Sequence, residues 1–376
     1  MSPTCCTFIA DHVLRALSES SRALEHVRQC SAKTLSINAC IRNERPVAQQ
    51  DVAGFVPPYV TPAVDESEPQ DREIRRVRAE WSGNLADGPA SKGGSVSLYD
   101  CRQSTSLPGT LIRKDDNKRV QDRTVNNAYD GLRIALEFFE TAIKRKSLDG
   151  ASLPLIGSVH YRSNYNNAMF DGRQMIFGDG DGEVFDYFAD PLDVIVHELA
   201  HGITQYTANL QYQDQSGALN ESISDVFACM AEQWHFSQTA AEGDWILRQN
   251  IFPVARRDVA LRSLKEPGMA YNDSLLGKDP QVGHMQNYIK TADDNGGVHL
   301  NSGIPNHAFY LAVMELGGHS WERAGQIWYR ALTDRRITST CTFKEFAELT
   351  VSNAQESDGK AGSDIVRHAW VSVGVW

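Results

Sequence analysis

The chain has 376 residues, of which 41% are hydrophobic and 23% charged, and its formal net charge is −11. A chain of this length exceeds what one hydrophobic core usually supports, so we expect two or three structural units. The negative charge argues against a nucleic-acid-binding surface, which needs a basic stripe. No run of residues approaches the ~20 apolar positions of a membrane span. The sequence therefore predicts a protein with no nucleic-acid partner and no membrane partner.

The cysteines and the first residues bear on the cellular compartment. The seven cysteines are scattered, odd in number and without C-x-x-C spacing, which argues against a disulfide framework and a cysteine zinc site. A signal peptide is not expected, because Asp11 and Arg15 interrupt the apolar patch at residues 8–10 and no basic segment precedes it. These features predict a cytoplasmic protein or one secreted by a non-classical route.

The first hundred residues differ in composition from the rest of the chain. Apolar residues near helical spacing predict an amphipathic helix over 7–30. Residues 61–97 are rich in Pro, Gly, Ser and charged residues, which is typical of a linker or an exposed arm.

Strand patterns dominate the next part of the chain, and helical patterns dominate the last part. We expect strands at 96–99, 109–113, 158–161 and 174–177, a helix over 124–145, and mostly helices beyond residue 190. This segregation predicts an α+β protein with two lobes, a β-rich lobe over 98–207 and a mostly α-helical lobe over 208–376.

An H-E-x-x-H motif provides two histidines, His197 and His201, at positions i and i+4. Their imidazoles lie one turn apart on one helix face, so both can reach a single metal ion. Glu198 lies beside that metal, where it can act as a general base. Asp190 as the N-cap and Pro191 at the first helical position would begin the helix. The motif also occurs by chance, but apolar neighbours indicate a buried helix, and burying these groups without a metal would be costly.

A second helix supplies the remaining ligand. Glu221 and Asp225 are also spaced i and i+4, and the apolar residues around them indicate burial. A catalytic zinc site needs three protein ligands and one open position, and two His with one Glu is an established set. Glu221 is the candidate ligand, and Asp225 could accept a hydrogen bond from one of the histidines. The layout H-E-x-x-H-x-x-G-x-x-H is excluded, because Thr204 and Thr207 occupy the Gly and His positions.

Further motifs make the sequence similar to a known family. They are Tyr165-Asn166-Asn167-Ala168, Gly178-Asp179-Gly180-Asp181-Gly182, Gly217-Ala218-Leu219-Asn220-Glu221, and the run from Asp294 to Gly303. With the two zinc motifs, they resemble the thermolysin family of zinc endopeptidases, in particular its protealysin-like branch with a short propeptide. The resemblance, from about residue 99 to the C-terminus, implies a two-lobed zincin with a central H-E-x-x-H helix.

The resemblance implies further catalytic residues. His299 matches the residue that hydrogen-bonds the transition-state oxyanion, Asp294 matches the carboxylate that orients it, and Tyr212 matches a second oxyanion donor. Asn220, which precedes the ligand Glu221, is a further candidate for supporting the zinc ligands from behind.

Substrate binding is also implied by the resemblance. Arg262 matches the arginine that binds a substrate carbonyl, while Asn167 and Ala168 match the strand edge that pairs with extended substrate. The family prefers a bulky apolar residue just after the scissile bond. Candidates for lining that pocket are Val194, Leu247 and Leu261, although ordinary core packing remains open for each.

Calcium binding is where the chain departs from the family. Asp193, Glu232 and Asp244 match positions of a double calcium site, but two further carboxylates are replaced near Ile246 and Arg248. Ca²⁺ takes 6–8 oxygen ligands, so we expect at most one calcium, with Arg248 supplying positive charge in its place. The run 178–182 superficially resembles an EF-hand loop, but the residues that follow do not fit, which favours a structural turn.

The N-terminal residues are similar to the propeptide motif of protealysin-like precursors. This similarity predicts a propeptide over 1–60 that docks on the catalytic domain as its inhibitor, followed by a processing site within 61–97. Cys5 or Cys6 could cap the zinc in the latent form, although ordinary buried or exposed thiols are the simpler expectation.

Together these features predict a monomeric, zinc-dependent neutral endopeptidase that acts on peptides and proteins, with one catalytic Zn²⁺. An aminopeptidase is disfavoured, because no Gly-x-Met-Glu-Asn-like element for binding a free amine precedes His197. An inactive peptide-binding relative would have lost the base or a ligand, yet Glu198 and the ligand set are present.

Overall fold

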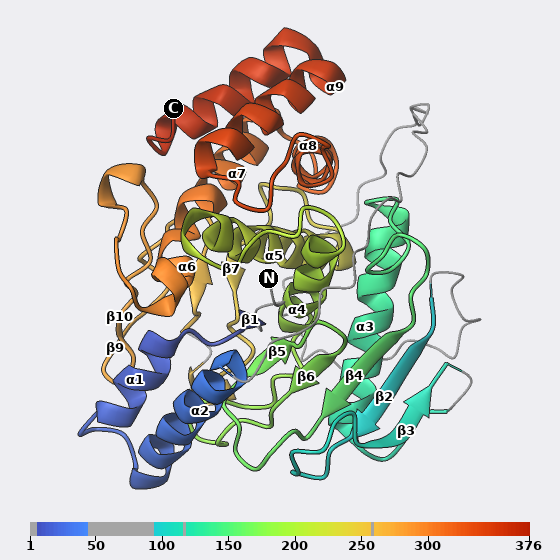
Figure 1. The fold of residues 1–376 in the computed structure, drawn as a ribbon, viewed down its shortest axis with the longest axis vertical. Coiled ribbons are helices and arrows are strands. Elements are labelled where there is room, and N and C mark those ends of the chain that lie inside the picture. Colours follow the sequence, from blue (N-terminus) through green and yellow to red (C-terminus); the bar gives the residue numbers. More distant parts are fainter. Residues whose placement is uncertain (1–5, 44–93, 116–117, 257–258) are drawn as a thin grey trace.

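The computed structural model describes residues 6–43, 94–115, 118–256 and 259–376. The predicted linker and processing site at 61–97 therefore fall largely outside the described residues, as does Cys5. Within these ranges a β-rich part and a helical part are joined through two central helices, α4 and α5 (Figure 1). This arrangement confirms the predicted α+β class with two lobes.

The main sheet contains parallel and antiparallel strands in the order β1-β5-β6-β4-β2-β3. The pairs β2–β4 and β4–β6 are parallel, whereas β2–β3, β5–β6 and β1–β5 are antiparallel. The strands are β1 (Cys6–Thr7), β2 (Val96–Asp100), β3 (Thr110–Lys114), β4 (Leu155–Val159), β5 (Ala168–Phe170) and β6 (Met175–Phe177). The predicted strand at 158–161 is displaced, because β4 ends at Val159 and His160 adopts a positive φ of 54°.

Helix α3 (Arg123–Thr141) packs on this sheet and on α4. The helix begins where the Asp122 side chain accepts a hydrogen bond from the Val125 N–H, as expected of an N-cap. Phe139 of α3 lies edge-on to Phe227 of α5 with ring centroids 5.2 Å apart, which links the sheet layer to the helical part.

Among the described elements, helices α4 (Leu192–Gln205) and α5 (Asp214–His235) form the most extensive helix pair. Both are almost entirely buried, so their polar residues need internal partners. The predicted start of α4 is shifted by one residue. Pro191 is the N-cap, and the Asp190 carboxylate instead pairs with Arg123 and accepts from Asn127.

The chain beyond α5 passes through short strands and turns before the last helices. The short elements are β7 (Ile246–Leu247), β8 (Arg262–Ser263), β9 (Asn272–Asp273), β10 (Gly277–Lys278) and the 3₁₀ turns Val254–Arg256 and Met285–Asn287. The helices are α6 (Asp294–Asn301), α7 (Gly303–Leu316), α8 (Arg323–Leu332) and α9 (Phe343–Ser372), with α7 to α9 at the end remote from the sheet (Figure 1). None of the helices in the described ranges has the length and apolar character needed to cross a membrane.

The N-terminal segment differs from the single helix predicted over 7–30. It forms β1, then α1 (Asp11–Glu19), then α2 (Glu25–Asn43), with a turn between the helices. The apolar residues Val13, Leu14 and Leu17 of α1 are buried, whereas Leu24 in the turn is 56% exposed. The prediction failed because the apolar spacing continues through residues 20–24, where the chain nevertheless turns back.

This segment packs against the edge of the sheet beside the central helices (Figure 1). Strand β1 pairs with β5 in the register Cys6–Phe170 and Thr7–Met169. On α2, Thr34 and Asn38 accept hydrogen bonds from the Asn166 N–H and the Tyr165 hydroxyl. Residues 6–43 are therefore an integral part of the folded chain.

Candidate metal centre and active site

Helix α4 brings the two histidines of the H-E-x-x-H motif together. Their Nε2 atoms are 3.1 Å apart and their rings are perpendicular. The Glu221 carboxylate on α5 faces both, with its oxygens 3.5 Å from His197 Nε2 and 3.4 Å from His201 Nε2. Ligands bound tetrahedrally at the usual zinc distances lie about 3.3 Å from one another, so the three donors match the spacing of a zinc site.

The same three residues stand out when the described ranges are searched for metal-binding groups. Only His197, His201 and Glu221 there bring three candidate ligand atoms within 4.8 Å of one another, and all three are buried. Burial lowers the pKa of His201 to about 3, which keeps the imidazole neutral as a ligand must be. Although burial opposes ionisation of Glu221, His299 and the histidines of α4 lower its pKa well below the usual range. The residues present therefore fit a zinc ion.

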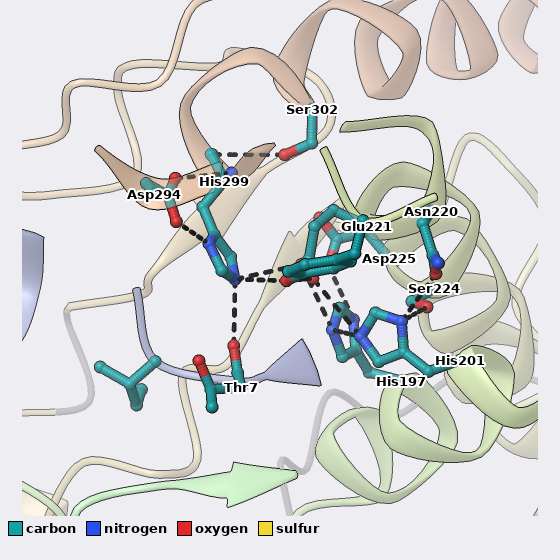
Figure 2. A network of polar contacts seen from close by, with 12 residues as sticks. Thr7, His197, His201, Asn220, Glu221, Ser224, Asp225, Asp294, His299 and Ser302 are labelled. Carbon is teal, nitrogen blue, oxygen red and sulfur yellow. Dashed lines mark hydrogen bonds and ion pairs between the residues drawn. The ribbon is translucent and has the colours of Figure 1, made fainter. Parts of the chain in front are cut away.

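The nitrogens of the two histidines that face away from the metal position are held by polar side chains (Figure 2). His197 Nδ1 lies 3.0 Å from Asp225 Oδ1, and His201 Nδ1 lies 2.8 Å from Asn220 Oδ1. Ser224 Oγ is 3.1 Å from the same nitrogen of His201. These contacts orient both rings, as second partners of metal-bound histidines usually do.

Glu198 lies beside the ligands with its carboxylate fully buried. No side chain of the described residues hydrogen-bonds its oxygens, whereas an interaction with the Phe170 backbone on β5 acts to lower its pKa. Burial, and next the negative charge of Glu221, raise the pKa of Glu198 well above its usual range. A carboxylate so placed is prepared to take and return a proton, which is what a general base requires.

His299 approaches the centre from the opposite side, just after the irregular first part of α6 (Figure 2). Asn295, Gly296 and Gly297 have positive φ values, and this turn folds Asp294 back onto His299. Asp294 Oδ1 is 2.7 Å from His299 Nδ1, and Asp294 Oδ2 accepts from the His299 N–H at 2.9 Å. Burial opposes protonation, but Asp294 and then Glu221 raise the pKa of His299.

Tyr212 completes this side of the site from the connection between α4 and α5. Its hydroxyl donates to Glu221 and lies 3.3 Å from His299 Nε2. Burial, followed by the charge of Glu221, raises the pKa of Tyr212 well above its usual range, so the hydroxyl remains a donor. The structure thus brings both predicted oxyanion donors next to the ligand carboxylate.

Two buried arginines lie behind the ligands. Arg262 on β8 donates to Glu221 Oε2 at 3.1 Å and to both oxygens of Asp225 at 2.8 and 2.9 Å. Arg248 donates through Nη2 to Asp225 Oδ1 at 2.7 Å and lies 2.9 Å from His197 Nδ1. Burial acts to raise the pKa of Asp225, but the charges of these two arginines lower it by more, so the net shift is downward.

Arg248 was considered at sequence level for the calcium site. Its backbone N–H does bond to Asp193 Oδ2 at 2.5 Å, but its guanidinium points to the zinc ligands. Asp193, Glu232 and Asp244 do not form a metal-binding group with one another within the described residues. In the 178–182 run, Asp181 accepts from three backbone N–H groups of residues 183–185, which makes it a turn.

The sequence predicted that the N-terminal segment docks on the catalytic domain, but not which of its residues contact the site. The Thr7 carbonyl accepts from His299 Nε2 at 3.0 Å (Figure 2). Phe8 packs edge-on to His197. Asn306, which donates to Asp225 Oδ2 at 2.9 Å, was missed too and carries no local signal. Ser224 did have a local signal in the sequence, because it lies one helical turn after Asn220.

Cys6 is buried beside Tyr212 but does not belong to the metal-binding group, and no disulfide joins the six described cysteines.

Comparison with known proteins gives consistent matches over most of the chain. Residues 74–205 match the family model described as "Thermolysin metallopeptidase, catalytic domain", and residues 208–375 match "Thermolysin metallopeptidase, alpha-helical domain". The chain is 48% identical over 298 residues to an extracellular metalloprotease of Pectobacterium carotovorum subsp. carotovorum, covering 79% of this chain and 85% of that one. It is 39% identical over 347 residues to protease PrtS of Photorhabdus sp. (strain Az29), covering 88% and 94%.

A solved structure matches nearly the whole chain. It is the precursor of protealysin, a metalloproteinase from Serratia proteamaculans, with a TM-score of 0.81 and 38% sequence identity. The match covers 99% of this chain and 100% of that one, so it includes the N-terminal segment as well as the catalytic part.

Proposed function

Since this chain belongs to the thermolysin family, as a protealysin-like zinc metalloendopeptidase, we propose that Glu198 is the general base of its peptide-bond hydrolysis. The observation that supports this assignment is the buried Glu198 carboxylate beside three converging ligand atoms. Zinc held by His197, His201 and Glu221 would lower the pKa of a bound water to about 7 and polarise the scissile carbonyl.

The protein residues then divide the remaining work. Glu198 accepts a proton from the attacking water and later delivers it to the leaving amine. His299 and Tyr212 donate hydrogen bonds where negative charge develops on the carbonyl oxygen, and Asp294 holds His299 in place. Their convergence at 3.3 Å supports this assignment.

Substrate binding follows from the sheet edge. Ala168 and Asn167 bond to an extended segment of the chain itself, which supports a role in pairing with extended substrate. Arg262 would bind a substrate carbonyl while neutralising Asp225 and Glu221. A bulky apolar residue is the expected preference after the scissile bond. Of the three predicted pocket residues, Leu261 borders the cavity beside Phe8, whereas Val194 and Leu247 are buried in the core.

Residues 1–60 act in this proposal as an inhibitory propeptide that is removed by cleavage within 61–97. The docked residues 6–43 and the match to a precursor structure support it. The proposal further includes a monomer that binds at most one Ca²⁺ and acts outside the cell. The relative named an extracellular metalloprotease supports the last point, whereas the sequence alone left a cytoplasmic location open.

A quenched-fluorescence peptide assay tests the assignment. A peptide blocked at its N-terminus should be cleaved internally, a zinc chelator should abolish cleavage, and added zinc should restore it. Glu198→Gln should lower kcat by roughly 10³-fold while zinc content stays at one per chain, because Glu198 is not a ligand. Activity that survives both treatments would contradict the proposal, and cleavage restricted to unblocked N-termini would indicate an aminopeptidase. Zinc binding without any cleavage would indicate an inactive peptide-binding relative.

A further inference from the structure

Residues Cys6–Ala10 lie along the site in the manner of an extended peptide. The Phe8 N–H donates to the Ala168 carbonyl at 3.0 Å. Asn167 brackets the next residue, because its Oδ1 accepts from the Ile9 N–H at 2.6 Å and its Nδ2 donates to the Ile9 carbonyl at 3.3 Å. The segment therefore has a defined direction and register on the sheet edge.

That register places one peptide bond at the reacting position. The Thr7 carbonyl oxygen is 3.0 Å from His299 Nε2, the nitrogen assigned above to the oxyanion. The peptide bond between Thr7 and Phe8 therefore occupies the position of a scissile bond. The Phe8 side chain accordingly fills the pocket for the substrate residue just after that bond.

The pocket around Phe8 is aromatic and cationic as well as apolar. The Phe8 ring is fully buried and lies edge-on to His197 at 5.4 Å and to Phe188 at 6.1 Å between centroids. The guanidinium carbon of Arg248 lies 4.1 Å from the centre of the Phe8 ring. The neighbouring cavity is bordered by Ala10, Leu261 and Arg262 among others.

Arg248 is held so that part of its guanidinium remains available to a pocket occupant. It is 1% exposed, and its Nη2 is bound to Asp225 and His197. Its Nη1 is buried and has no hydrogen-bond partner in the described part of the chain.

We propose that Arg248 is a specificity-determining residue that makes this pocket select aromatic side chains over aliphatic ones of similar size. The proposal rests on the endopeptidase function above and narrows its substrate class. An aromatic ring stacked on a desolvated guanidinium gains cation–π attraction, which an aliphatic side chain cannot provide. An acidic side chain is disfavoured, because it would add negative charge beside Asp225 and Glu221.

The test compares three peptides that differ only in the residue after the scissile bond, which is Phe, Leu or Glu. For the processed wild-type enzyme we expect kcat/KM to be about tenfold higher for Phe than for Leu, and lowest for Glu. Arg248→Met, which keeps the length of the side chain, should bring the Phe to Leu ratio close to one. Arg145→Met, which removes a buried arginine outside the site, should leave the ratio unchanged.

The ratio of two rates does not depend on how much enzyme is active, so partial loss of zinc or of folded protein does not affect it. Equal or better cleavage of the Leu peptide, best cleavage of the Glu peptide, or an unchanged ratio in Arg248→Met would overturn the proposal. If no peptide and no casein is cleaved, the endopeptidase function itself fails, which is a different result.

A second measurement needs no substitution of Arg248. Synthetic peptides of residues 6–15, with Phe or Leu at position 8, are tested as inhibitors of the processed wild-type enzyme. We expect the inhibition constant to be about tenfold lower for the Phe peptide. Equal constants would overturn the proposal even if Arg248→Met does not fold.

Discussion

At the scale of single residues, Asp225 joins the zinc ligands to the arginines behind them. It contacts His197, Arg248 and Arg262, and it accepts from Asn306. A buried carboxylate is stable only when it is paired and hydrogen-bonded, and this one is surrounded by donors. Its charge is therefore expected to matter both for the orientation of His197 and for the balance of the two buried guanidinium groups.

Asp225→Asn keeps the size of the side chain and removes its charge. We expect zinc affinity to fall by about 10–100-fold, as is usual when the carboxylate behind a metal-bound histidine is lost. Zinc retained in competition with a chelator measures the effect. Asp364→Asn, which affects an exposed carboxylate paired with Lys360, is the control and should retain zinc like the wild type. Unchanged affinity in Asp225→Asn would show that its charge is dispensable.

His160 provides a pH-dependent contribution to stability away from the active site. Its ring lies 2.8 Å from Asp179 and 3.0 Å from Asp122. Burial opposes protonation, but these carboxylates raise the pKa of His160 to about 9, above the usual 6.5. Since the folded-state pKa is the higher one, the contribution is fully present below pH 6.5 and is lost as the pH rises through 9.

His160→Gln should therefore lower the free energy of unfolding at pH 6 by about 2 kcal/mol, an amount discounted for the partly exposed Asp122. At pH 10 the loss relative to the parent should be much smaller. Urea unfolding of both proteins in a Glu198→Gln background, which prevents self-digestion, gives the comparison. A loss that is independent of pH would rule out the charged pairing.

At the scale of elements, the turn that begins α6 decides where His299 lies. Four successive residues with positive φ, Asp294 to Gly297, reverse the chain before the regular helix. A Cβ at Gly296, where φ is 84°, would come within 2.1 Å of Asp214 Oδ1 at the start of α5. Helix α5 carries Glu221, so this close approach of backbone and side chain sets the distance between His299 and the metal ligand.

Gly296→Ala should displace the turn and with it the His299 imidazole. We expect kcat to fall by roughly 10²-fold, the usual cost of losing an oxyanion donor, with less change in KM. Steady-state kinetics on one peptide substrate would measure this. Gly182→Ala is the control. Gly182 has a similar φ of 75°, but a Cβ there would have no heavy atom within 4 Å. This substitution therefore adds the same backbone strain without the clash and should leave kcat unchanged. Equal effects of both substitutions would mean that backbone strain alone is responsible.

Element prediction succeeded where local patterns match tertiary burial. The strand-rich region, α3 and the two central helices follow from periodicity, because one face of each lies against the core. The N-terminal helix was predicted as one element, and it is two. A turn at residues 20–24 lets α2 pack back onto the chain near Asn166, and that packing depends on residues far away in sequence.

At the scale of the whole molecule, the N-terminal segment closes the active site of its own catalytic domain. Its β1 extends the sheet at β5, its Thr7 carbonyl binds His299, and Phe8 fills the adjacent pocket. The edge of the sheet at β5 is thereby paired by the chain's own β1. This arrangement is what the proposed inhibitory propeptide requires, because the same polypeptide contains the ligand set and the segment that covers it.

Phe8→Ala should weaken this inhibition before any processing occurs. Removing a fully buried aromatic side chain typically costs about 3–5 kcal/mol. A loss of this size weakens docking of the segment, so we expect the initial rate of the uncleaved precursor to rise at least about 10²-fold. A small fluorogenic substrate reports the rate, and a gel confirms that the chain is intact. Leu24→Ala, at a residue that is 56% exposed, should leave the precursor latent. A latent Phe8→Ala precursor would mean that other contacts hold the segment in place.

The sequence by itself determined the chemistry that depends on neighbours along the chain. Spacing of i and i+4 places His197 and His201 on one face of a buried helix, and it places Glu221 and Asp225 on another, whatever the rest of the fold does. The α+β class followed in the same way from the order of the periodic segments. These inferences hold because helix geometry converts sequence separation directly into distance.

The tertiary structure alone decided what meets those residues. Arg248 was interpreted at sequence level as a replacement in a calcium cluster, yet its guanidinium lies against His197 and Phe8. Thr7 is far from His299 in sequence, and no periodicity relates them. Contacts of this kind arise because buried charges and rings must find partners in the packed interior, and their choice depends on how distant elements are brought together.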